Sequence, residues 1–479
     1  MTRRCQVARA ISGAFFIGLL AFGLILSACS VGPDYARPPV TTPAQYKEAG
    51  AASLAQSVDQ MIKPKWWEMF GDTELNGLEE QVDVSNQNIA QAVANYRQAL
   101  ALVQSARAAY FPTVTIGVGV SRLQNSPTIS PGEVKDTTPF TEHSMPIEVS
   151  WEVDVWGRIR RLVESTQANA QANEADLEAA KLSARSQLAQ AYFLLRTLDA
   201  QKELLEATVV AYQKSVELTT NRYNSGVASR GDVLQAQTQL KSTQAQEIDI
   251  TVQRAQVEHA IALLIGKAPA EVSVSVAALN AIPPVLPAGV PEEILKRRPD
   301  VAAAERLMAS ANAQIGVAVA AYYPDVSVNS SGGFESTSAS KWFSWMGRFW
   351  SVGMGMTQTL FDGGLRGAQV DRARAAYDAS VASYRETVLT GYQEVEDSLA
   401  AQRILDSEAR TQDEAVEAAQ QSLAVILNQY QAGIVSYLNV IVAQTIALSN
   451  QRTAVDILGR RMNAAVLLIK ALGGGWQTT

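Results

Sequence analysis

The sequence predicts an α+β fold in which long antiparallel helical hairpins and short β-hairpins occur twice along the chain. Residues around Gly226 recur in the same order around Gly433, at a constant offset of 207 (433 − 226). A long stretch with almost no helix-breaking residues precedes each glycine, and segments of alternating apolar and polar residues precede each stretch. A period this long indicates a duplicated domain, because solenoid repeats span about 20 to 50 residues.

The first residues have the features of a secretory signal, so we expect residues 1–28 to be a signal peptide. Three arginines precede an apolar run that ends in Leu26-Ser27-Ala28-Cys29. The small residues before Cys29 resemble a lipobox, which implies a covalent lipid on this cysteine and, with Ser30 after it, sorting to the outer membrane. Two or more acyl chains anchor a protein stably. A structural cysteine is the alternative interpretation.

The composition of the mature chain argues against several classes of function. Removal of the signal also removes Cys5, so we expect no disulfide. Of the 40 Lys and Arg residues, three lie in the signal, which leaves 37 against 47 Asp and Glu; this acidic excess argues against nucleic acid as a partner. His143 and His259 have no partner at metal-ligand spacing. We therefore expect no metal, no cofactor beyond the covalent lipid, and no enzyme activity.

Prolines are frequent in the segment after the signal, and we expect residues 29–65 to form a lipidated, extended tether. Proline fixes its own φ and favours extended backbone in the residue before it. Beyond the tether we predict two structural repeats, residues 66–289 and residues 290–479. The prolines of the tether are Pro33, Pro38, Pro39, Pro43 and Pro64.

The stretch from Arg158 to Ser225 contains neither glycine nor proline. A helix over this stretch would be about 100 Å long, far longer than the helices of a compact core. Each long helix is expected to turn at a Tyr-x-x-Gly sequence and to return through a shorter helix, with tips near 223–229 and 430–436. An ordinary antiparallel coiled coil would show the same periodicity.

A β-hairpin is predicted ahead of each long helix, at about 113–154 and at about 325–361. Thr113–Ser121 alternates as one strand, and a polar loop from Leu123 to Ser144 leads to its partner. Each run has about the 9 to 11 residues that a tilted strand needs to cross a bilayer, although a soluble β-sandwich would alternate in the same way. The predicted apolar face comprises Ile147, Val149, Trp151, Val153, Trp350, Val352, Met354, Met356 and Leu360.

Four strands cannot close a membrane pore within one chain. The mature sequence has no run of about 18 apolar residues for a transmembrane helix, so a chain that spans the bilayer would span it as a β-barrel. Single-chain barrels start at about eight strands, and open strand edges are unstable in lipid. The strand count therefore predicts an oligomer.

Five motifs, taken in order, carry a resemblance that covers nearly the whole mature chain. They resemble the TolC-like outer-membrane factors, in the lipoprotein branch of the OprM and NodT type. The motifs are Val31-Gly32-Pro33-Asp34-Tyr35, Trp66-Trp67, Trp151-Glu152-Val153-Asp154-Val155-Trp156-Gly157-Arg158, Arg298-Pro299-Asp300-Val301 with Glu305, and Leu472-Gly473-Gly474-Gly475-Trp476.

This resemblance implies a homotrimer with a twelve-stranded transmembrane β-barrel, to which each chain contributes four strands, and a periplasmic α-barrel built from the helical hairpins. It implies the exit channel of a tripartite efflux pump, which passively conducts drugs or other toxic small molecules from the periplasm to the outside. The implied partners are a periplasmic adaptor of the membrane fusion type, an inner-membrane resistance-nodulation-division transporter that supplies the energy, and outer-membrane lipid.

The resemblance also places the contact with the adaptor at the periplasmic tips. A helix break that needs only its glycine is the alternative for any single residue. Relatives close the tip with a ring of aspartates, but Val442 occupies that position here and Gln431 stands where an arginine can stand. Our hypothesis is an apolar constriction of Val442 side chains, with Asp232 as a second residue lining the opening. The predicted tip contacts are Tyr223, Gly226, Val227, Ser229, Tyr430, Gly433, Ile434 and Ser436.

Three other functions compete with an efflux channel. A periplasmic hydrolase lacks support, because the sequence contains no Gly-x-Ser-x-Gly, phosphate-loop or dinucleotide motif. A periplasmic structural or adaptor lipoprotein without a pore leaves the two bilayer-length hairpins unexplained. A duct for protein secretion differs mainly in its cargo, and the resemblance alone favours efflux.

Overall fold

The computed structural model describes residues 30–48, 62–124, 138–279, 282–284, 286 and 290–476. The predicted signal peptide and Cys29 lie outside the described residues. The chain forms two compact units, and each unit takes segments from both predicted repeats. The first comprises Met1–Pro38, Tyr96–Ala172 and Ala304–Ser383, and the second comprises Pro39–Asn95, Asn173–Ala303 and Tyr384–Thr479.

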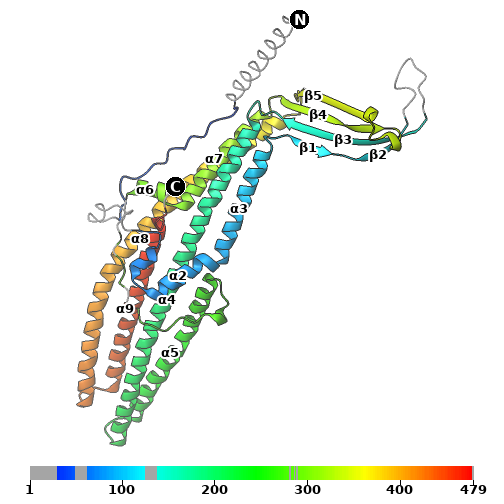
Figure 1. The fold of residues 1–479 in the computed structure, drawn as a ribbon. Coiled ribbons are helices and arrows are strands. Elements are labelled where there is room, and N and C mark those ends of the chain that lie inside the picture. The colour runs from blue at the N-terminus through cyan, green and yellow to red at the C-terminus, as the bar shows by residue number, and fades with distance from the viewer. Residues whose placement is uncertain are drawn as a thin grey trace. The chain divides into compact units, whose positions relative to one another are not determined.

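The first unit contains an antiparallel sheet in the order β1-β3-β4-β5, with β2 also paired to β3 (Figure 1). The register within each pair of neighbouring strands is unbroken, so cross-strand partners lie on the same face throughout. The strands are β1 (Thr113–Ile116), β2 (Gly119–Leu123), β3 (Phe140–Glu152), β4 (Asp325–Ser336) and β5 (Arg348–Thr357).

The prediction of one continuous strand over Thr113–Ser121 was wrong, because the structure divides it into β1 and β2. Both pieces pair with β3 in the same register. The break lies opposite Pro146, whose carbonyl accepts a hydrogen bond from the Gly117 N–H at 2.9 Å. Proline has no N–H to return that bond, so the ladder is interrupted at this point.

The strand ends also differ from the prediction. β3 starts at Phe140, inside the segment predicted as a polar loop, and it ends at Glu152. Val153 and Asp154 therefore lie beyond the strand, and Leu360 lies beyond β5. The Asp154 carboxylate instead accepts hydrogen bonds from the backbone N–H groups of Ile159 and Arg160, in the first turn of α4 (Arg158–Asn224), at 2.9 Å.

An extended N-terminal strap, residues 30–38, packs against helices of the first unit. Arg161, which is nearly buried, donates to the Val31 carbonyl at 3.2 Å and to the Asp34 carboxylate at 2.7 Å. The Tyr35 hydroxyl donates to Glu305 at 2.6 Å. The strap therefore has defined side-chain contacts where the sequence predicted only a tether. The helices at this unit are α3 (Gln87–Ala108), α7 (Pro299–Ala320) and the first part of α4.

The second unit contains the parts of two helical hairpins that include their turns. Helices α4 and α8 have 67 residues each, and their partners α5 and α9 have 35 residues each. Gly391 lies within α8 without interrupting it. The hairpin helices are α4 (Arg158–Asn224), α5 (Arg230–Leu264), α8 (Leu365–Gln431) and α9 (Tyr437–Ala471); the short elements are η3 (Trp66–Phe70), α2 (Thr73–Ser85), η4 (Pro269–Glu271) and α6 (Pro291–Arg297).

Buried ion pairs join the short helix α2 to the long helices of the second unit. The side chain of Asp199 is 1% exposed, and its carboxylate forms ion pairs with Arg196 at 3.1 Å and with Arg254 at 2.6 Å. Arg196 also reaches the Glu74 carboxylate of α2. Because each buried charge of this network has a partner, removing one member would leave another charge buried and unpaired, at a high cost in stability.

Candidate functional site: the exposed sheet face and the helical tips

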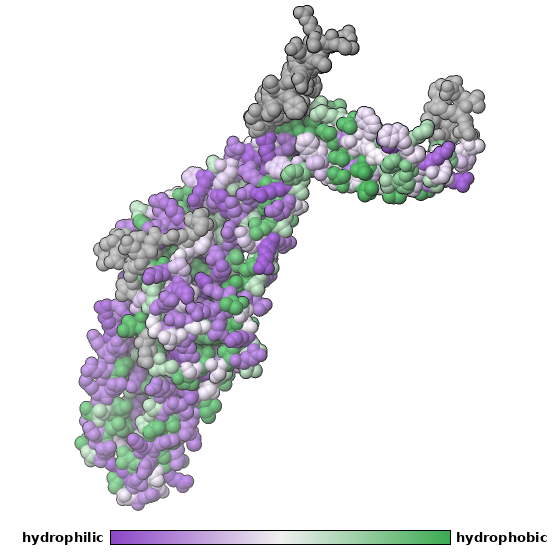
Figure 2. Space-filling view, viewed as in Figure 1, coloured by the Kyte–Doolittle hydropathy of each residue, from purple (hydrophilic) through white to green (hydrophobic). Residues whose placement is uncertain are grey.

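One face of the sheet is apolar and exposed. Val114 of β1 lies opposite Val149 of β3, and Val328 of β4 lies opposite both Trp151 of β3 and Met354 of β5, so apolar pairs occur between each two neighbouring strands in the order β1-β3-β4-β5. Met354 is 74% exposed and Trp350 is 81% exposed. Figure 2 shows apolar side chains at the surface along the sheet. An exposed apolar surface of this kind marks a contact with a membrane or another protein.

The opposite face of the sheet is polar and lined by small side chains. One cross-strand row on this face runs from Thr115 through Glu148 and Ser331 to Ser351. Glu152, farther along β3, forms an ion pair with Arg158 at 2.6 Å. The small residues leave space above this face, which suits contact with water. The remaining small or amide residues here are Gly119, Ser121, Ser144, Ser150, Ser327, Asn329, Gly333, Gly353 and Gly355.

The two helical tips end in the same backbone motif. Gly226 has φ +75° and Gly433 has φ +78°, the left-handed conformation that glycine adopts without strain. Val227 donates its N–H to the Arg222 carbonyl at 2.8 Å, and Ile434 makes the equivalent bond to the Gln429 carbonyl at 2.9 Å. These six-residue closures end a helix by satisfying its last carbonyls.

The helices that leave the tips start differently. Ser229 and Asp232 form a reciprocal capping box at the start of α5, with both hydrogen bonds at 3.1 Å. Ser436 occupies the equivalent position before α9 but accepts no side-chain capping bond. The Asp232 carboxylate, predicted to line an opening, therefore caps a helix in this structure.

The two tip tyrosines lie in different environments. Tyr223 is 44% exposed, whereas Tyr430 is 3% exposed and packs against Tyr437 with ring centroids 5.4 Å apart. Burial raises the pKa of Tyr437 to about 12. Val227 and Ile434 are exposed on their turns. The apolar turn residues and Tyr223 are thus available to a partner, while Tyr430 supports the tip from inside.

Arg222 joins the two hairpins and was not identified from the sequence. Its guanidinium lies 4.7 Å from the centre of the Tyr430 ring and donates to the Gln431 carbonyl at 2.9 Å. This hydrogen bond connects residues 209 positions apart. Local periodicity carries no signal for a contact at that separation.

Val442 belongs to an exposed apolar stripe on α9. Leu438, Val442 and Ile446 are spaced by four residues and each is at least half exposed. The Gln431 side chain is exposed as well, and its carbonyl holds Arg222. The stripe is therefore free to line a passage or to meet another helix.

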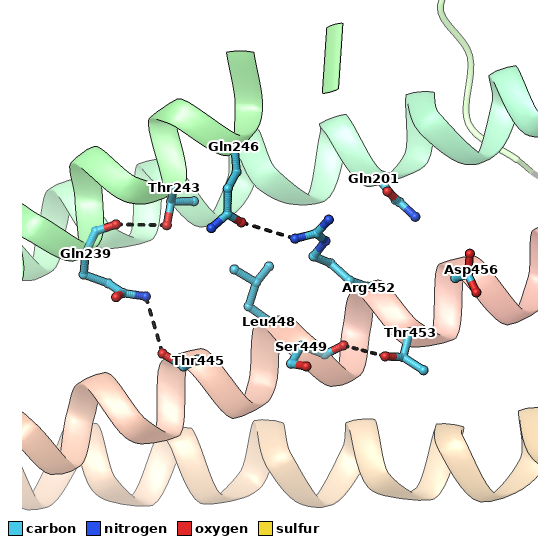
Figure 3. A pocket seen from close by; sticks show the side chains of 10 residues that line it. All are labelled: Gln201, Gln239, Thr243, Gln246, Thr445, Leu448, Ser449, Arg452, Thr453 and Asp456. Carbon is cyan, nitrogen blue, oxygen red and sulfur yellow. Dashed lines mark hydrogen bonds between the residues drawn. The ribbon is translucent and has the colours of Figure 1, made fainter. Parts of the chain in front are cut away.

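A polar groove of about 480 Å³ runs between α5 and α9, next to α4 (Figure 3). Gln239 donates to Thr445 at 3.5 Å across it, and Arg452 donates to Gln246 at 3.2 Å. These amide, hydroxyl and guanidinium groups suit water or a polar partner rather than an apolar ligand.

The described residues contain no group of His, Cys, Asp and Glu side chains that could hold a metal ion. None of the helices within the described ranges combines the length and the apolarity that a bilayer crossing requires.

A family model described as outer membrane efflux protein matches residues 78–267 and 290–474. The solvent efflux pump outer membrane protein SrpC of Pseudomonas putida is 32% identical over 461 residues, which cover 95% of this chain and 97% of SrpC. The cation efflux system protein CusC of Escherichia coli is 29% identical, with 95% of this chain and 97% of CusC covered.

A solved structure of the outer-membrane channel OprN matches with a TM-score of 0.88 and 31% identity. The match covers 94% of this chain and 100% of the OprN chain. The likeness thus includes the strands as well as the helical hairpins.

Proposed function

The chain belongs to the outer membrane efflux protein family, and we propose that it acts as a homotrimer in which three sheets close on one another around a single pore. Its function is that of an outer-membrane efflux channel. The proposal concerns how this chain builds the channel and which parts of it meet its partners.

The opposed faces of the sheet carry this proposal. The exposed apolar face suits the hydrocarbon of a bilayer, and the small, polar face suits a water-filled passage. Within the described residues, the edge strands of the sheet lack a partner on their outer side. Unpaired backbone groups are costly in lipid, so further strands from other copies would have to pair with them. Since β1 and β2 lie in line along the same side of β3, each chain supplies four strand positions, and three copies would supply twelve.

The helical tips are the proposed contact with a periplasmic adaptor. Val227 and Ile434 are exposed apolar residues at equivalent positions of two closed turns. Through the adaptor, an inner-membrane transporter of the resistance-nodulation-division type would supply the energy. The channel then needs no reaction chemistry of its own, and its cargo of small molecules would be chosen mainly by the transporter.

We also propose an apolar gate and a lipid anchor. The exposed Val442 stripe would face the passage near the tip, where three copies would bring three such stripes together. The covalent lipid would sit on Cys29, immediately before the strap that Arg161 holds. The anchor would therefore join the chain at a point with fixed contacts.

The native mass of the protein, extracted from outer membranes in mild detergents, tests the shared pore. We expect three times the mass of one chain. A stable monomer in every detergent would contradict the proposal. Cysteine pairs introduced at the outer edges of β1 and β5 add a second readout, because the mature chain holds no other thiol than the lipid-bearing Cys29. We expect crosslinks between copies and not within one chain.

A further inference from the structure

The two faces of the sheet carry charges of opposite sign. Because the register is unbroken, each strand residue can be assigned to a face. Arg122 and Arg348 are the arginines of strands β1 to β5, and both belong to the apolar face. All strand carboxylates belong to the polar face; they are Glu142, Glu148, Glu152, Asp325 and Glu335.

The arginines lie at one end of the apolar face. Arg122 is the penultimate residue of β2, and Arg348 is the first residue of β5, so both are next to hairpin turns. The opposite strand ends lead into helices. Lys341 lies in the turn between β4 and β5 and is exposed. Among the described residues, neither Lys341 nor Arg348 forms an ion pair with a carboxylate, and Arg348 donates its Nε–H to the Trp345 carbonyl at 3.2 Å. Two cations are thus available to an anion at this end.

Aromatic residues surround these cations. Trp342 stacks on Phe343 with centroids 4.9 Å apart, and Phe343 packs against Phe334 of β4. This stack holds the turn on the sheet, yet Trp345 is 78% exposed and Met346 is 93% exposed. The Arg348 guanidinium lies over the Trp345 ring. Exposed tryptophan beside cations is the arrangement found where a protein crosses the interface of a bilayer.

We propose that this turn end, formed by Lys341, Arg348 and Trp345, binds the phosphate groups of the glycolipid in the outer leaflet of the outer membrane. Arginine binds phosphate through two parallel N–H bonds, and lysine adds a point charge. The turns lie at the strand ends away from the helices. In the proposed channel the helices lie in the periplasm, so the turns lie on the other side of the membrane, at the outer leaflet. The inference rests on the proposed contact of the apolar face with the bilayer.

The test is lipid retention by the full-length trimer reconstituted in phosphatidylcholine bilayers. One set of bilayers contains lipid A and another contains phosphatidylglycerol at equal charge; lipid retained after extraction is measured by mass spectrometry. Wild type is expected to retain lipid A preferentially. The Lys341→Gln/Arg348→Gln variant is expected to lose that preference, by about fivefold for each cation removed. Arg107→Gln, an exposed arginine on α3, is the matched control and should behave as wild type.

Three results would overturn the inference: equal retention of lipid A by wild type and the double variant, an equal loss in the Arg107→Gln control, or no preference of wild type for lipid A over phosphatidylglycerol. Arg348→Lys provides a milder variant, which keeps the charge and should retain part of the preference. Quenching of Trp350 fluorescence by lipids with brominated chains tests the premise separately, by comparison with Trp350→Phe. Absent quenching contradicts the membrane contact itself, whereas quenching without lipid A preference contradicts the glycolipid site alone.

Discussion

The guanidinium of Arg222 lies over the ring of Tyr430, and through this contact one helical hairpin holds the end of the other. Arg222 belongs to the last turn of α4, and Tyr430 belongs to the last turn of α8. The same guanidinium donates to the Gln431 carbonyl. Both tips end in the same backbone closure, and this single side chain couples the two turns.

Replacing Arg222 by alanine should loosen both tips. The variant loses a hydrogen bond from a charged donor, worth about 1.5 to 3 kcal/mol, and a cation–π contact. We expect backbone amides of 226–229 and 433–436 to exchange about tenfold faster or more in hydrogen-exchange mass spectrometry. Arg230→Ala, on an exposed residue of the same tip, is the control. Equal exchange in the two variants would show that Arg222 does not hold the tips together.

A carboxylate in the exposed stripe of α9 should change conduction. If Val442 forms the constriction, Val442→Asp brings three negative charges together in the trimer and raises cation permeability, measured as single-channel conductance in planar bilayers. Ile446→Asp, one helical turn away, should have a smaller effect. Unchanged conductance in Val442→Asp removes Val442 from the gate.

The carboxyl of Glu79 makes stability depend on pH. Glu79 is fully buried, its oxygens have no hydrogen-bond partner in the described structure, and this burial raises its pKa well above the usual range while Arg185 lowers it. Because the pKa of Glu79 is higher in the folded state, the contribution of its protonated carboxyl to the free energy of unfolding is complete below the pKa that Glu79 has in the unfolded chain. This contribution declines as pH rises toward the pKa in the folded state.

Glu79→Gln should remove this decline, because a neutral amide has no proton to release. We expect a higher Tm than wild type at pH 8 and little difference at pH 4.5. Glu80→Gln, on an exposed neighbour that pairs with Lys65 at 2.9 Å, serves as the control. A pH dependence that persists unchanged in Glu79→Gln would assign it to other groups.

The N-terminal strap should depend on a close contact between two glycines. A Cβ on Gly32 would lie 2.4 Å from Gly316 Cα, and Gly32 also has φ +96°. Gly71 has φ +66°, but a Cβ there meets nothing within 4 Å. Gly71→Ala should therefore lower the free energy of unfolding only by the cost of placing alanine in the left-handed conformation, about 1–2 kcal/mol. Gly32→Ala should exceed that loss of stability and expose the strap to protease. Equal losses would mean that the strap tolerates displacement.

The sequence predicted features that local patterns encode. Alternation located the β-hairpins, and glycine spacing located the tips, because both depend on the residue and its near neighbours. Prediction from the sequence failed where a residue far along the chain determines the local structure. Pro146 divides the strand opposite it, and Arg222 reaches a carbonyl 209 residues away. The compact units also combine segments of both predicted repeats, since the strands of each predicted repeat lie in one unit and its helical tip lies in the other.

The separation of charge between the sheet faces also protects the sheet against mispairing. Sliding one strand by a single residue would exchange its faces. On β3, that slip would turn Glu142, Glu148 and Glu152 to the apolar face and would move Ile147 and Trp151 to the polar face. In the proposed membrane-spanning arrangement, a misaligned strand would place carboxylates in hydrocarbon, so the bilayer itself would disfavour the wrong register.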